Sequence, residues 1–103
     1  MFIVLLKFSD NRSQAGNFMD GHNAWINNGF DDGVFLLVGS IEPNLGGSVI
    51  AHNCSLSNLQ DRVNEDPFVT GNVVTAEIIE LSPKAADERL SFLVGQKYAK
   101  PEP

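Results

Sequence analysis

The sequence has few of the features that cross-link a chain, carry it through a membrane or bind it to nucleic acid. Cys54 is the only cysteine among 103 residues, so an intramolecular disulfide is impossible. No run approaches the ~20 apolar residues that a membrane-spanning helix needs. Lys and Arg number 7 against 13 Asp and Glu, a net charge of −6. Because a phosphate backbone rewards clustered basic residues, we expect no nucleic acid and no membrane among the partners.

The apolar opening run, residues 1–8, lacks the flanks of a signal peptide. No basic segment precedes it and no small-residue cleavage site follows it. Together with the single cysteine this favours a reducing compartment, and we expect a cytoplasmic protein. A hydrophobic fraction of 43% beside 19% charged residues is typical of a globular domain, which we place at residues 1–95, with 96–103 as a loose tail.

Apolar periodicity predicts an α+β protein with the element order β-α-β-β-α-β, which is the ferredoxin-like pattern. The expected elements are strands at 2–8, 34–41, 48–54 and 73–81, a helix from Ala15 to about Phe30, a short helix carrying Leu59 and Val63, and a C-terminal helical extension at 84–93. Ser13 is expected to cap the first helix. A capping box over 57–60 is expected to open the second.

The strands at 2–8 and 34–41 carry apolar residues on both faces. Two helices can cover only one face of a four-stranded sheet, so the other face needs a second cover. We therefore expect a homodimer that packs through the sheet face.

His22 lies inside the apolar stripe of the first predicted helix, on the face that carries Met19 and Ile26. A histidine there is either a core residue bonded to a backbone carbonyl or an acid/base group at a site. Gly21 beside it is either tolerated in the helix, at about 1 kcal/mol relative to alanine, or lets another segment approach closely. The residues alone leave both questions open.

Six segments, in this order and spacing, resemble the YCII-related (YciI-like) family from about Met1 to Pro83. They are "MFIV", "DGHNAWI", "LLVGS", "GGSVIA", "EDPF" and "AEIIELSP". The resemblance implies a dimeric α+β barrel and a catalytic dyad of His22 and Asp66. A few proteins of that family eliminate chloride from a chlorinated hydroxyquinol. The chain departs from the family pattern at Ser40, where proline is frequent, and at Asn23, where leucine is frequent.

Asp66 on its own could cap a helix or shape the turn before Pro67. As the partner of His22 it would orient the imidazole, and we expect a contact of about 2.6–3.2 Å beside a concave pocket. Ser40 is the best candidate for a nucleophile, although an ordinary strand-end serine is the simpler interpretation. Trp25 and Phe68 are expected either to pack in the core or to line that pocket.

His52 and Cys54 are expected on one face of the third strand, with a spacing that matches no established zinc site. We therefore predict no metal and no cofactor. The resulting hypothesis is a small-molecule enzyme, dehydrochlorinase-like (a lyase) or hydrolase-like, in which His22 and Asp66 carry out proton transfer or elimination. The alternative is a non-catalytic module of the same fold that binds a small ligand or a protein. A pocket at His22 would favour the enzyme, and a filled core there would favour the module.

Overall fold

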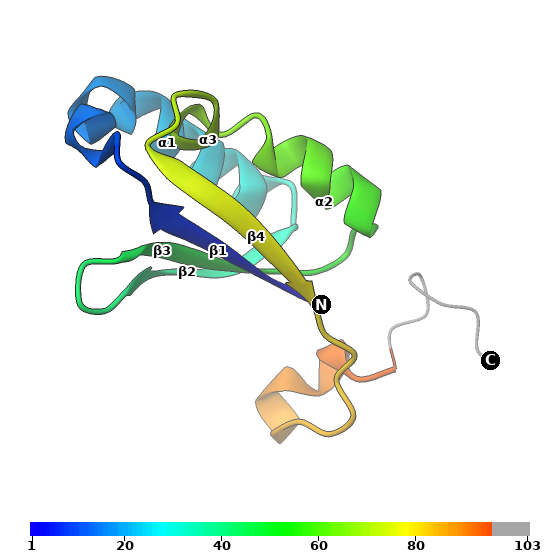
Figure 1. Ribbon diagram of the computed structural model, residues 1–103. Coiled ribbons are helices and arrows are strands. Elements are labelled where there is room, and N and C mark those ends of the chain that lie inside the picture. The colour runs from blue at the N-terminus through cyan, green and yellow to red at the C-terminus, as the bar shows by residue number, and fades with distance from the viewer. Residues whose placement is uncertain (96–103) are drawn as a thin grey trace.

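One antiparallel sheet organises the chain in the computed structural model, which describes residues 1–95 (Figure 1). Its strands are β1 (Phe2–Phe8), β2 (Phe35–Ile41), β3 (Gly46–Ala51) and β4 (Val74–Glu80). Their spatial order is β2-β3-β1-β4, with β1 hydrogen-bonded to β3 on one side and to β4 on the other. This order, with helices between β1 and β2 and between β3 and β4, confirms the predicted ferredoxin-like α+β fold.

The helices lie on one side of the sheet (Figure 1). They are α1 (Ala15–Asp31), α2 (Leu56–Val63) and the single-turn α3 (Pro67–Thr70). The 3-10 turn η1 (Arg12–Gln14) precedes α1, and the 3-10 turn η2 (Glu88–Leu93) lies in the extension after β4, away from these helices (Figure 1). Among residues 1–95, no helix is long and apolar enough to cross a membrane.

Two predicted helix caps are wrong. Ser13 lies within η1, and the cap position of α1 is Gln14, which makes no side-chain capping bond. The backbone of η1 itself supplies acceptors at this end, since the Ala15 N–H donates to the Arg12 carbonyl. For α2 the cap is Ser55, whose side chain accepts from the Asn58 N–H at 3.1 Å, and not the box expected from residue 57.

The third strand and the C-terminal helix are shorter than expected. β3 ends at Ala51, and Asn53 has a positive φ of 60°, so the chain turns early toward α2. In the extension, Asp87 is extended and its carboxylate accepts from the Arg89 N–H at 2.9 Å, so the helical turn starts only there. The tail predicted at 96–103 lies outside the described residues.

The helix-covered face of the sheet forms the core. On β1 the alternate residues Phe2, Val4 and Leu6 are buried, as the two-residue period of a strand requires. Val49 and Ala51 of β3 pair with this set and are buried with it. The helices and the segments that join them to the sheet complete the same cluster with Trp25, Val34, Phe35, Leu59, Val63, Phe68, Val73 and Val74.

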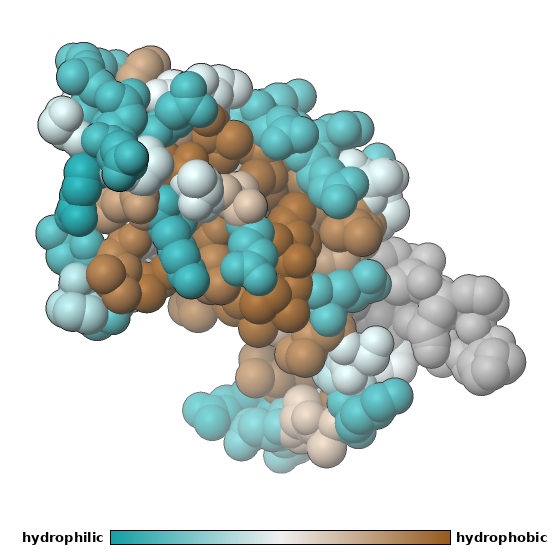
Figure 2. Space-filling model, in the orientation of Figure 1, coloured by the Kyte–Doolittle hydropathy of each residue, from teal (hydrophilic) through white to brown (hydrophobic). Residues whose placement is uncertain are grey.

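Within residues 1–95, no α-helix covers the opposite face of the sheet. One row of apolar residues crosses all four strands there, because Leu37 pairs with Ile50, Ile50 with Ile3, and Ile3 with Ile79. Leu37 is 60% exposed and Ile79 39%. Figure 2 shows apolar residues gathered in the middle of the molecule, with polar side chains around them and a few lying across them.

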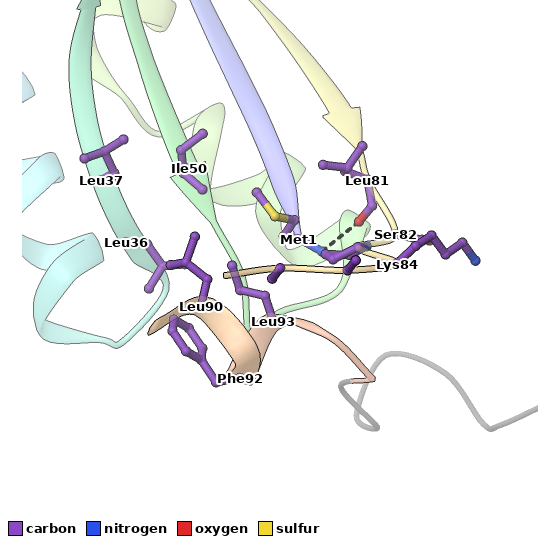
Figure 3. A pocket seen from close by; sticks show the side chains of 13 residues that line it. Met1, Leu36, Leu37, Ile50, Leu81, Ser82, Lys84, Leu90, Phe92 and Leu93 are labelled. Carbon is purple, nitrogen blue, oxygen red and sulfur yellow. Dashed lines mark hydrogen bonds between the residues drawn. The ribbon is translucent and has the colours of Figure 1, made fainter. Parts of the chain in front are cut away.

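The extension after β4 borders an apolar groove at one end of this open face. The groove has a volume of about 760 Å³ and runs between strand residues such as Leu36 and Ile50 and the extension's own Leu90 and Leu93. Figure 3 shows Leu90 and Leu93 pointing toward the strands, with Met1 anchored to the Leu81 carbonyl by a 3.0 Å hydrogen bond. The extension therefore covers only part of the open face.

Candidate functional site

His22 and Asp66 are in contact, although 44 positions separate them. The Nδ1 atom of His22 lies 2.8 Å from Oδ1 of Asp66, within the expected range. The His22 side chain is 13% exposed and the Asp66 side chain is fully buried. The structure thus confirms that the two residues form a pair, while its catalytic role stays a prediction.

Local backbone geometry explains how Asp66 reaches the pair. Proline disfavours the helical conformation in the residue before it, and Asp66 is accordingly extended, with φ −65° and ψ 123°. Pro67 then occupies the first position of α3, where its missing N–H costs nothing. Asp66 caps this helix, and its Oδ1 accepts from the Phe68 N–H at 3.0 Å. The capping and pairing interpretations of Asp66 are therefore both correct, and both use the same oxygen.

Two glycines let α1 and α3 approach each other closely. A Cβ atom at Gly21 would lie 2.9 Å from Cγ of Pro67, and one at Gly71 would lie 2.7 Å from the Phe18 ring. A real side chain at either position would have to displace its neighbour. The absence of a side chain at Gly21 therefore lets α3 pack closely against α1. The residue that Gly21 faces, Pro67, directly follows Asp66 in the chain.

Aromatic rings surround the imidazole of His22. Phe68 stacks on it face to face, with ring centroids 3.8 Å apart and planes 4° apart. Trp25 lies farther away, with its centroid at 5.9 Å, and its indole N–H donates to the Arg62 carbonyl at 2.8 Å. Within residues 1–95, the hydrogen bond found for this imidazole is the one that Nδ1 makes with Asp66.

A cavity of about 350 Å³ opens beside His22, between α1 and the sheet. Its polar side chains are His22, Asn23, Ser40 and Ser48, and its walls are mainly apolar residues and glycines. Its lining residues are Leu6, Phe8, Met19, His22, Asn23, Ile26, Val38, Gly39, Ser40, Gly46, Gly47, Ser48, Val49, Phe68 and Val74. His22 is the only titratable side chain in this set, so any proton transfer to a bound molecule would pass through it.

The other candidate residues divide between this cavity and its surroundings. Ser40 and Phe68 line the cavity, whereas Trp25 lines a separate polar cleft with Asp61 and Arg62. Within residues 1–95 no hydrogen bond joins Ser40 to His22, so the structure does not show an activated serine nucleophile.

His52 and Cys54 do not share a strand face, because β3 ends before them. Burial, and then the N-terminal ammonium, lower the pKa of His52. Burial raises the pKa of the Cys54 thiol, which keeps it in its unreactive protonated form. No group of three metal-ligating side chains occurs within the described 95 residues.

Sequence reasoning missed the double role of Phe68, which donates its N–H to Asp66 and stacks its ring on His22. The available signal was the spacing of the two residues, because Phe68 occupies the second helical position after a cap at Asp66. Asn23 and Ser40, the two departures from the family pattern, both line the cavity.

Comparisons with known proteins support the fold. No family model matches the sequence, and no curated protein matches it. Among solved structures, the chain is similar to the 5-chloro-2-hydroxyhydroquinone dehydrochlorinase TftG from Burkholderia phenoliruptrix AC1100, in complex with 2,5-dihydroxybenzoquinone. The TM-score is 0.65 and the identity 13%, over 84% of this chain and 100% of that one. At this identity the likeness shows a shared fold.

Proposed function

We propose that the chain is a YCII-like, cytoplasmic small-molecule enzyme in which His22 is the acid/base group and Asp66 its orienting partner. The 2.8 Å contact between a fully buried carboxylate and an imidazole at a cavity wall carries this proposal. With Nδ1–H donated to Asp66, the lone pair of Nε2 is left to accept a proton. The imidazolium that forms is then stabilised by the Asp66 carboxylate.

The cavity lining indicates the class of substrate. Among residues 1–95, the cavity lining includes no Lys or Arg to hold a phosphate and no carboxylate to hold a cation or metal. Its volume of about 350 Å³ suits a single small ring. The substrate we propose is a small, uncharged or weakly acidic ring compound with hydroxyl or carbonyl groups within reach of His22, Asn23 and Ser40.

Elimination is the reaction that these groups support best. Nε2 of His22 accepts a proton from the substrate, the electron pair left behind forms a new π bond, and the leaving group departs with its own bonding pair. This step needs one base and no cofactor. The activity named for TftG, loss of hydrogen chloride from a hydroxylated ring, is of this kind.

Chloride release from 5-chloro-2-hydroxyhydroquinone tests the proposal. We expect turnover by the unaltered protein and a loss of about 10²–10⁴-fold in His22→Ala, the range for removing a general acid/base. His52→Ala, which replaces the other histidine, is the matched control and should keep the full rate. Equal rates in both variants would refute the role of His22. Binding of 2,5-dihydroxybenzoquinone without any turnover would instead support a ligand-binding module.

We further propose that the enzyme is a homodimer through the open face of the sheet. The apolar row across the four strands supports this, since isolated chains rarely expose a continuous apolar face. We expect light scattering at micromolar concentration to give twice the 11.2 kDa chain mass. Leu37→Glu, on the open face, should give monomers. Leu56→Glu, on α2 on the other side of the sheet, should not, and a monomeric unaltered protein would contradict the proposal.

A further inference from the structure

We propose that Phe68 is the positioning residue of the site and sets the orientation of both members of the dyad. The inference rests on the proposed function, because it concerns how His22 and Asp66 are held for proton transfer. Phe68 contacts Asp66 through its backbone N–H, at 3.0 Å, and His22 through its ring, at 3.8 Å between centroids. One residue thus reaches both partners from within α3.

The orientation of the imidazole needs an external constraint. The torsion between Cβ and the ring of a histidine is broad, so it does not select one ring plane by itself. The Phe68 ring lies 4° from parallel with the imidazole and covers one of its faces. Tilting the imidazole out of this plane would break the stack. The stack therefore holds the ring plane, and within that plane the hydrogen bond to Asp66 selects Nδ1 and leaves Nε2 free of that contact.

The orientation of the carboxylate depends on the same residue. Oδ1 of Asp66 accepts both the His22 bond and the Phe68 N–H. Oδ2 is buried and has no hydrogen-bond partner in the described part of the chain. Because all hydrogen bonds of this side chain within residues 1–95 meet at Oδ1, the Phe68 N–H is the protein contact that fixes the carboxylate when His22 is protonated or deprotonated.

Ordinary core packing would make different demands on this position. Phe35 is a core phenylalanine that packs edge-on against Trp25, with centroids 5.0 Å apart, and it lines no part of the His22 cavity. At such a position an aliphatic side chain still fills the core, at some loss of stability. A stacking role, in contrast, requires an aromatic ring. The two residues are therefore a matched pair for a test.

The test uses Phe68→Leu and Phe68→Tyr, with Phe35→Leu as the control for losing a buried ring. Nitrogen-15 NMR of His22, at a pH where the imidazole is neutral, reports which ring nitrogen carries the proton. We expect a single Nδ1–H tautomer in the unaltered protein, Phe68→Tyr and Phe35→Leu, and a mixture of both tautomers in Phe68→Leu. For chloride release from 5-chloro-2-hydroxyhydroquinone, kcat should fall by about 10-fold or more in Phe68→Leu, since small misplacements of reacting groups are costly. KM should stay within about threefold.

A single Nδ1–H tautomer with unchanged kcat in Phe68→Leu would overturn the inference. So would a rise in KM at constant kcat, which would make Phe68 a substrate contact. If Phe68→Leu does not fold, Phe68→Met provides the same comparison with a more adaptable side chain. Should the unaltered protein release no chloride, the proposed function fails, and the tautomer measurement still decides the role of Phe68.

Discussion

Asp66→Asn is expected to abolish turnover while leaving the fold in place. Oδ1 of Asp66 serves both the Phe68 N–H and Nδ1 of His22, so an asparagine oxygen in the same place keeps the cap of α3 and the Nδ1–H tautomer. The variant loses the negative charge that stabilises the imidazolium formed during the reaction. We expect turnover to fall by about 10²–10⁴-fold, the range for disabling a general acid/base.

Chloride release and nitrogen-15 NMR of His22 measure the two halves of this prediction. Asp87→Asn is the matched control, because Asp87 caps η2 in the same way, through the Arg89 N–H, and contacts no part of the cavity. It should change neither turnover nor the tautomer. A protein with asparagine at position 66 that retained more than about a tenth of the rate would show that the carboxylate is structural, since a general acid/base partner contributes far more.

The parts of the fold that depend on local periodicity were predictable. β1 has the predicted bounds, and α1 extends one residue beyond the expected end. Ser55 was not identified as the α2 cap, because its role depends on where β3 ends. That end is set by the positive φ of Asn53, which no periodicity signals. α3 was missed because a single helical turn is too short to show a period.

The residues of the site and the contact between His22 and Asp66 were predictable, whereas the packing around them was not. His22 was identified by its place in an apolar stripe, and Asp66 by a family resemblance. The stack of Phe68 on His22 and the closeness of Pro67 to Gly21 depend on how α3 packs against α1. These contacts join segments more than 40 positions apart. Local sequence patterns, such as periodicity and capping, do not indicate how closely two distant segments pack.

Gly21→Ala is expected to disturb the dyad from a position that does not touch it directly. Alanine is the better helix former by about 1 kcal/mol, so in open space the change would stabilise α1. Here the new Cβ would lie 2.9 Å from Cγ of Pro67. The proline ring is rigid, so the strain has to move α3, at a cost of about 1–3 kcal/mol. We expect a lower melting temperature and, because Asp66 moves with Pro67, a fall in kcat of about 10- to 100-fold.

Gly16→Ala is the control that separates helix propensity from contact. Gly16 lies in the same helix, and a Cβ there would meet nothing within 4 Å. This variant should melt at the same or a higher temperature and keep full turnover. Thermal melts and chloride release on both variants complete the comparison. If Gly21→Ala stabilised the protein as much as Gly16→Ala did, the close packing of α1 on α3 would not be what holds Asp66 against His22.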